Sequence, residues 1–354
     1  MALSYGRLPT SRAPTFTWTT FEIEDGRSRE RGRGAGAQWG TPGDIEGSLK
    51  IPPYVFLTLA PLFWAGNFVF GRPLSEALPP FGINLIRWLV ACAILVPLTL
   101  YLEGRFPRPA RHLWPGLLVM ALAGVLLFNS LVYLSLEYTT STNAALINGA
   151  TPILTIFIAA MVGFDRLTGR RVAGALTSLL GVGWIVSRGS LEALSSFSFN
   201  RGDLVMLVAA LLWAIYTVLV IRVTRVMSPL AVTTIAAVLA MPLSLLIGGY
   251  ELATQPIGEI TPVVVLGLVY VGVVASVGAF LFWSIGVKDI GAARASVFLN
   301  LIPVFTAVIA AVTLDERPGL PQLIGGLLVV CGVTLASSRG RKTADTKPAS
   351  SEMP

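Results

Sequence analysis

The sequence predicts an all-α membrane protein in which ten transmembrane helices form two inverted five-helix repeats. Three observations lead to this prediction. Of the 354 residues, 54% are hydrophobic and only 13% are charged, whereas a soluble domain carries about 25% charged residues. The charged residues are clumped, so that ten long stretches contain none. A similar segment also occurs twice, as TPILTIFIAAMVGFDR at 151–166 and as IPVFTAVIAAVTLDER at 302–317.

The predicted spans are the stretches that lack Asp, Glu, Lys and Arg. A helix needs about 20 mostly apolar residues to cross the roughly 30 Å hydrocarbon layer, and nearly all of the stretches approach or exceed that length. One of them, 88–102, reaches it when Arg87 is included. A membrane β-barrel would show alternating segments of about 10 residues, and this pattern is missing. The stretches are 53–71, 88–102, 113–136, 138–164, 172–187, 204–221, 226–250, 260–287, 295–314 and 318–338.

Residues of the first half recur in the second half at a fixed spacing of 151 positions. Similar apolar composition would produce chance matches of aliphatic residues, but it would not align prolines, glycines and arginines in one frame. The matched pairs include Pro152 with Pro303, Arg166 with Arg317, Gly174 with Gly325 and Gly181 with Gly332. We therefore expect five-helix repeats at 53–189 and 203–338, with disordered tails at 1–50 and 339–354.

The basic residues of the loops predict how the repeats are oriented. Because five is odd, the second repeat has to enter the membrane from the opposite side. In the first repeat the second and fourth loops carry most of the arginines, and in the second repeat the first and third loops carry most of the Lys and Arg. Under the positive-inside rule, both repeats place the N- and C-termini in the cytoplasm. We expect a multi-pass protein of the cell inner (plasma) membrane.

Several classes of function are excluded by what the sequence lacks. The net charge is +7, but the basic residues lie in tails and loops and do not form a nucleic-acid-binding face. Cys92 and Cys331 lie within apolar stretches and the single histidine, His112, lies in a loop, so no metal site or disulfide framework is expected. The absence of any Gly-Lys pair excludes a P-loop ATPase. We expect no cofactor and no enzymatic activity.

Inverted repeats are typical of transporters, which bind substrate near mid-membrane between the repeats. The sequence therefore predicts a secondary transporter or facilitator that works by alternating access. Its expected partners are a small-molecule substrate and the lipid bilayer, without nucleic acid. The sequence is compatible with a monomer and with a homodimer. The alternatives are a non-transporting receptor or scaffold, duplicated for stability, and an intramembrane enzyme, for which no clustered nucleophile, metal site or carboxylate pair is found.

Five stretches of the chain carry a resemblance to a known family. They are LAPLFWAGNFVFGRPL (59–74), LIRWLVACAILV (85–96), YTTSTNAALINGATPILT (138–155), LLWAIYTVLVIR (211–222) and DIGAARASVFLNLIPVFTAVIAAVTLDERPGLPQLIGGLLVVCGVTL (289–335). In their order and spacing they resemble the EamA-type transporters of the drug/metabolite transporter superfamily over about 53–338. The resemblance implies ten helices, cytoplasmic termini and transport of small organic metabolites, with export of amino acids or related compounds common in the family. We therefore expect export.

Two prolines and two asparagines form one group of candidate residues. Pro152 and Pro303 lie inside the fourth and ninth predicted spans, where proline removes a helical hydrogen bond and kinks the helix. Asn148 and Asn300 lie beside them, and an amide cannot stay unpaired in hydrocarbon. We expect kinked helices that line the substrate path. The alternative is ordinary bending with hydrogen bonds between helices.

Aromatic residues form a second group. Trp64 and Trp213 are matched between the repeats and lie midway along their spans, too deep for the interfacial aromatic belt. These residues either pack in the core or frame a pocket for an apolar or aromatic ligand. The predicted pocket consists of Trp64, Asn67, Tyr133, Trp213, Tyr216 and Trp283.

Arg87 is an intramembrane charge, which is a functional hypothesis by default. The predicted spans contain no acid to neutralise it. We expect a structural or gating role, a contact with a substrate carboxylate or phosphate, or snorkelling to the outer surface.

Small residues recur on one face of each predicted span at 172–187 and 318–338. They are Gly174, Ser178 and Gly181 in the first and Gly325, Gly326 and Gly332 in the second. Such faces allow helices to approach closely, and we expect them to pack within the chain rather than in a dimer.

Overall fold

The computed structural model describes residues 51–139, 141–165, 167–192, 200–313 and 319–338. All regular structure in these ranges is helical, which confirms the all-α class. The predicted tails at 1–50 and 339–354 lie outside the described residues. The helices of the first half are α1 (Pro53–Ala77), α2 (Pro80–Glu103), η1 (Arg111–Leu113), α3 (Trp114–Met120), η2 (Ala121–Leu127), α4 (Phe128–Leu136), α5 (Ser141–Gly149), α6 (Thr151–Met161) and α7 (Gly169–Val186). Those of the second half are α9 (Arg201–Thr224), α10 (Pro229–Thr254), α11 (Pro262–Tyr270), η3 (Val271–Gly278), α12 (Ala279–Ile290), α13 (Ala292–Ala295), η4 (Ser296–Asn300), α14 (Leu301–Thr313) and α15 (Leu320–Ser337).

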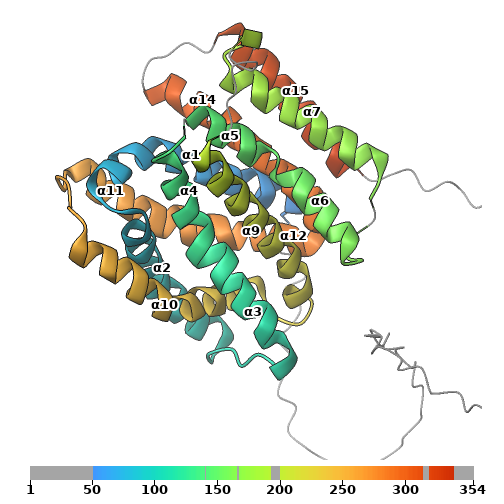
Figure 1. Ribbon diagram of the computed structural model, residues 1–354. Coiled ribbons are helices and arrows are strands. Elements are labelled where there is room, and N and C mark those ends of the chain that lie inside the picture. The colour runs from blue at the N-terminus through green and yellow to red at the C-terminus, as the bar shows by residue number, and fades with distance from the viewer. Residues whose placement is uncertain (1–50, 140, 166, 193–199, 314–318, 339–354) are drawn as a thin grey trace, which may run out of the picture. The chain divides into compact units, whose positions relative to one another are not determined.

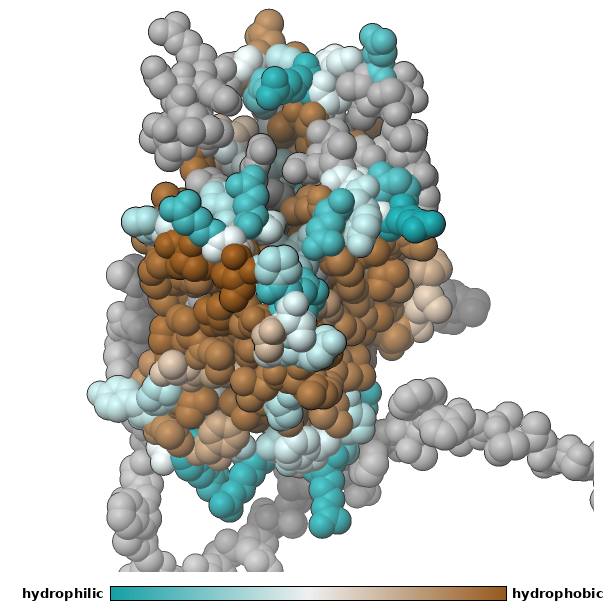
Figure 2. Space-filling model, turned by 60° about the vertical axis from the view of Figure 1, so that its left-hand side comes forward, coloured by the Kyte–Doolittle hydropathy of each residue, from teal (hydrophilic) through white to brown (hydrophobic). Residues whose placement is uncertain are grey.

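Eight stretches of the described residues are long and apolar enough to cross a membrane. They correspond to eight of the ten predicted spans. The other two predicted spans, at 53–71 and 172–187, are also helical and lie in α1 and α7. Figure 2 shows a broad apolar surface with hydrophilic residues gathered above and below it, as expected for a protein that exposes its apolar side chains to lipid.

Helix starts follow from local sequence. Seven of the described helices carry a proline in their first turn, where the missing N–H would have no helical partner; they are α1, α2, α3, α6, α10, α11 and α15. The start of α9 carries a capping box. In it, the Asn200 side chain accepts from the Asp203 backbone N–H at 3.0 Å, and the Asp203 carboxylate accepts from the Asn200 N–H at 2.8 Å.

The helices of the two halves pack against one another in reciprocal pairs. In the first half α1 contacts α12 and α14, and in the second half α9 contacts α4 and α6. The helix α2 packs on α10, and α7 packs on α15, its neighbour in Figure 1. The contacts of α1 therefore have counterparts in those of α9, with the halves exchanged.

The contact between α7 and α15 is made by the predicted small residues. A Cβ atom on Gly174 would lie 2.6 Å from the Gly332 carbonyl oxygen, and one on Gly181 would lie 2.6 Å from that of Gly325. The two backbones therefore touch, which only glycine permits. The predicted packing of these faces within the chain is confirmed.

Non-α segments occur at matched places in the two halves. The π-helical segments η2 and η3 interrupt the third and eighth predicted spans. The fourth predicted span is broken between α5 and α6, immediately before Pro152, and the ninth passes through the 3₁₀ segment η4 before Pro303. Both prolines lie in the first turn after the interruption, where their missing N–H groups cost no helical hydrogen bond.

Candidate functional site

A cavity of about 400 Å³ lies between helices of both halves. This volume lies within the usual range of small-molecule sites, about 300–1,000 Å³. The cavity reaches the surface at Ser75 and Glu76, both exposed, near the end of α1. Its walls come from α1, α4, α5, α9, η4 and α14. The lining residues are Trp64, Asn67, Gly71, Ser75, Glu76, Phe128, Asn129, Val132, Tyr133, Leu136, Ala144, Ala145, Asn148, Met206, Trp213, Leu299 and Ile302.

The aromatic wall of the cavity is built around the two matched tryptophans. The rings of Trp64 and Trp213 meet edge to face with their centroids 5.1 Å apart, and Phe128 packs on Trp213 at 4.6 Å. The Trp64 indole N–H donates to the Ala275 carbonyl at 3.0 Å, which holds its ring in place. A fixed aromatic surface of this kind suits an apolar or aromatic group.

Of the predicted pocket residues, Trp64, Asn67, Tyr133, Asn148 and Trp213 line the cavity. Asn67 carries a buried Oδ1 without a hydrogen-bond partner among the described residues. The Asn148 Oδ1 accepts from the Thr151 hydroxyl at 3.3 Å, across the break between α5 and α6.

The other predicted residues lie behind the cavity wall. Tyr216 and Trp283 are fully buried and pack against Trp213, with ring centroids 5.1 Å and 6.0 Å away. The Trp283 N–H donates to the Thr217 hydroxyl at 3.3 Å. Asn300 donates from Nδ2 to the Ser178 hydroxyl at 2.7 Å, which joins η4 to α7. These side chains are occupied by contacts within the core.

The π-helical segments supply carbonyl acceptors to polar side chains of α2. Asn84 donates to the carbonyls of Val125 and Leu126 in η2 at 3.1 Å and 3.2 Å. One turn later, Arg87 reaches the Ala275 carbonyl of η3 at 3.4 Å. The irregular backbone of a π-helix leaves such carbonyls without a standard helical partner. The two π-segments therefore anchor the helix that carries the buried cation.

Arg87 is fully buried and points toward the region behind the cavity wall. Its Nε contacts the Ser276 hydroxyl and its Nη1 donates to the Asn129 Oδ1 at 3.0 Å. The Tyr133 phenol also interacts with the guanidinium. No acidic side chain of the described ranges forms an ion pair with it. The described Arg87 does not snorkel, and two of its neighbours, Asn129 and Tyr133, line the cavity.

At the end opposite the cavity mouth, α1 packs against α12 and η4. Near the start of α1 the rings of Tyr54 and Phe298 stack with centroids 6.1 Å apart. Leu57 fills the space where Gly286 has no side chain, since a Cβ there would lie 2.3 Å from the Leu57 Cγ.

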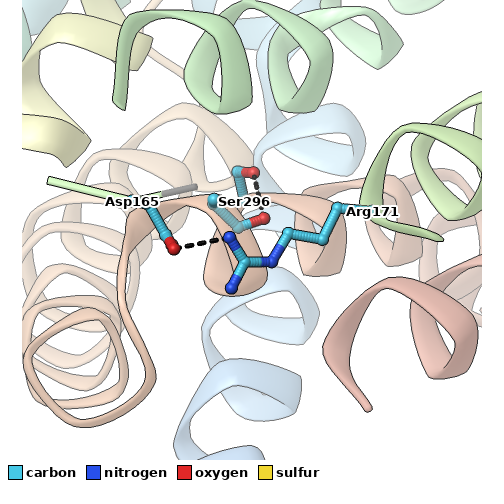
Figure 3. A network of polar contacts seen from close by, with 4 residues as sticks. Asp165, Arg171 and Ser296 are labelled. Carbon is cyan, nitrogen blue, oxygen red and sulfur yellow. Dashed lines mark hydrogen bonds and ion pairs between the residues drawn. The ribbon is translucent and has the colours of Figure 1, made fainter. Parts of the chain in front are cut away.

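An ion pair joins Asp165, in the loop after α6, to Arg171 in the first turn of α7. Figure 3 shows Asp165 and Arg171 facing each other beside Ser296 of η4. An oxygen of Asp165 also lies within 3.4 Å of the position that a Cβ on Gly291 would occupy. The loop is therefore packed against the turn between α12 and α13.

Three residues of the cavity region were not predicted. Asn129 and Ser276 are polar residues within long apolar stretches. Their sequence signal is that a polar side chain buried there needs a hydrogen-bond partner. Glu76 follows the stretch at 53–71 and was assigned to a loop, whereas α1 extends to Ala77. The helix therefore carries a carboxylate to the rim of the cavity.

A family model and individual relatives both show that the chain is similar to transporters. Residues 51–187 and 200–338 each match the EamA-like transporter family. An uncharacterized transporter of Archaeoglobus fulgidus is 31% identical over 290 residues, 81% of this chain and 97% of that protein. A probable terminal-alkyne amino-acid exporter of Streptantibioticus cattleyicolor is 26% identical over 82% of this chain and 96% of its own length. One solved crystal structure, 22% identical, has the same fold with a TM-score of 0.67 over 80% of this chain and 96% of that chain.

Proposed function

Because the chain belongs to the EamA-like transporter family, we propose that it is a secondary transporter or facilitator that exports small organic metabolites by alternating access. The substrates are amino acids or related compounds, a class supported by the similarity to the probable amino-acid exporter of Streptantibioticus cattleyicolor. The chain catalyses no reaction and acts in the cell inner membrane.

One observation carries this proposal. The cavity lies between helices of both halves and reaches the surface near Glu76. Its lining on α1 runs from Trp64 to Glu76 and does not extend to the start of that helix, where Tyr54 stacks on Phe298. Alternating access requires such a cavity, open to one side at a time, at the interface of the repeats. A scaffold duplicated for stability has no need of an open cavity lined by amides and aromatic rings.

We propose ten spans in two inverted repeats at 53–189 and 203–338, with both termini in the cytoplasm. The reciprocal contacts α1 with α12 and α4 with α9 support this arrangement, as do the matched π-segments η2 and η3. In this topology the end of α1 that carries Glu76 faces outward, so the described conformation is open to the outside.

The cavity-lining residues Trp64, Asn67, Tyr133, Asn148 and Trp213 contact the substrate in this proposal. Arg87, Tyr216, Trp283 and Asn300 support the wall from behind. Breaks before Pro152 and Pro303 allow the helices on either side to change their relative tilt during the transport cycle.

Counterflow into proteoliposomes tests the function. Purified protein is reconstituted in vesicles loaded with unlabelled compound, and uptake of the labelled compound is measured for a panel of amino acids, other organic anions, amines and neutral metabolites. We expect flux for at least one class, and a loss of tenfold or more for Trp64→Ala, Trp213→Ala and Asn148→Ala, about the factor for one lost contact. The matched control is Leu327→Ala, an exposed residue of α15 far from the cavity lining.

The outcomes separate the alternatives. Flux that the three cavity variants leave unchanged contradicts the assigned site, and no flux for any compound supports a receptor or scaffold. Topology is tested with single cysteines at Arg108 and Gln255, in a chain whose Cys92 and Cys331 are replaced by alanine. Labelling of both from the same side of the membrane contradicts the inverted arrangement.

A further inference from the structure

The side-chain amide of Asn129 has a fixed orientation. Its Oδ1 accepts from Arg87 Nη1 at 3.0 Å. A guanidinium only donates hydrogen bonds, so the atom that faces it has to be the amide oxygen, and the NH₂ group has to point away. Asn129 is 6% exposed, lines the cavity, and its Nδ2 has no partner among the described residues. The cavity wall therefore carries a buried amide whose two N–H donors are unused.

Behind this amide lies a positive charge that has no counter-ion among the residues described by the structure. Arg87 is fully buried, and the groups around its guanidinium are neutral: the Ser276 hydroxyl, the Ala275 carbonyl, the Asn129 amide and the Tyr133 phenol. Its guanidinium also lies 6.0 Å from the centroid of the Phe280 ring. A buried cation is stabilised only in part by neutral dipoles. The positive potential of Arg87 therefore extends to the cavity that Asn129 lines.

We propose that Asn129, polarised by Arg87, is the subsite for the carboxylate of an anionic substrate with an apolar body. This inference rests on the proposed transport function and specifies its substrate class. A hydrogen bond from the Asn129 amide to the substrate carboxylate is charge-assisted and about twice as strong as one between neutral groups. Arg87 compensates the negative charge of that carboxylate. Arg87 is a positioning residue here, because it acts through Asn129. The apolar body lies against Trp64, Trp213 and Phe128, which line the same cavity.

The number of donors and charges favours a carboxylate over a phosphate. The subsite offers two N–H groups and one compensating charge, which suits a singly charged group. Glu76 lines the same cavity, but it is exposed at the rim, where water and salt screen its repulsion of an anion.

Wild-type protein provides the first test. Binding is measured as ligand-induced thermal stabilisation of the detergent-solubilised full chain, with matched pairs of an acid and its neutral amide: 3-phenylpropionate with 3-phenylpropionamide, and indole-3-acetate with indole-3-acetamide. We expect the acids to bind about tenfold tighter or more, as for one charge-assisted hydrogen bond. Equal affinities within the pairs, or no binding of any acid, overturn the subsite.

The variant Asn129→Asp provides the second test. Aspartate is isosteric, pairs with Arg87 and offers no N–H donor, so we expect the preference for acid over amide to disappear while the melting temperature is kept. The control is Gln255→Glu, the same amide-to-carboxylate change at an exposed position after α10, which should leave the preference intact. A purely structural role for Arg87 predicts an unchanged ratio in Asn129→Asp, and that result overturns the proposal. Should Asn129→Asp not fold, the wild-type comparison decides alone.

Counterflow separates failure of this subsite from failure of the proposed function. Flux of neutral or cationic compounds without flux of the acids contradicts the carboxylate subsite and leaves a transporter. No flux across the whole panel contradicts both.

Discussion

The glycine contact between α7 and α15 predicts that a change from glycine to alanine there lowers stability, whereas the same change at a control position does not. In Gly181→Ala the new Cβ would lie 2.6 Å from the Gly325 carbonyl oxygen and 2.7 Å from the Val329 backbone nitrogen. Ordinary van der Waals contact begins at 3.4 Å, and both neighbours are backbone atoms that cannot rotate away. The helices therefore have to separate by most of an ångström. Overpacking of this kind costs about 1–3 kcal/mol.

The control is Gly249→Ala in α10, where nothing lies within 4 Å of the new Cβ. Alanine is favoured over glycine in a helix by about 0.5–1 kcal/mol, so this variant should be as stable as the wild type or more so. The assay is thermal unfolding in detergent, followed by tryptophan fluorescence. A melting temperature for Gly181→Ala equal to that of Gly249→Ala would refute the backbone contact.

Two further predictions concern the pair α2 and α10. The buried hydroxyls of Thr99 and Thr234 lie 2.7 Å apart. Replacing either threonine by valine leaves the other hydroxyl without a hydrogen-bond partner and should lower the free energy of unfolding by about 1–3 kcal/mol, whereas replacing both should be nearly neutral. Additive losses in a double-mutant cycle would argue against the hydrogen bond. Glu251 accepts from two backbone N–H groups at the start of α2, at 2.8 Å and 3.1 Å. Because the carboxylate stabilises the positive end of that helix, Glu251→Gln should lower stability in denaturant titration by about 0.5–1 kcal/mol, and a loss equal to that of the exposed control Glu259→Gln would contradict this role.

Several features of the site were predictable from residue type and depth. Trp64 and Trp213 lie midway along their stretches and both line the cavity. Pro152 and Pro303 mark the two interrupted helices because proline lacks an N–H group and is tolerated in the first turn after a break. Arg87 was expected to lack an intramembrane acid, and it has no ion pair among the residues that the structure describes.

Other features had no signal in the sequence. The π-segments η2 and η3 contain ordinary apolar residues, and their altered hydrogen bonding becomes visible only with Asn84 and Arg87 in contact with their carbonyls. Tyr216 and Trp283 are aromatic residues within apolar stretches, like the aromatic residues that line the cavity, yet they pack behind Trp213.

The sequence by itself determined that the chain is helical and membrane-spanning, where along its apolar stretch each polar residue lies, and that its halves are related. These properties follow from the length and order of apolar stretches along one dimension. Only the tertiary structure decided which of those residues meet at the cavity. The angular position of a side chain around its helix has meaning only relative to the helices that pack on it, and for α1 and α9 several of those helices come from the other half of the chain.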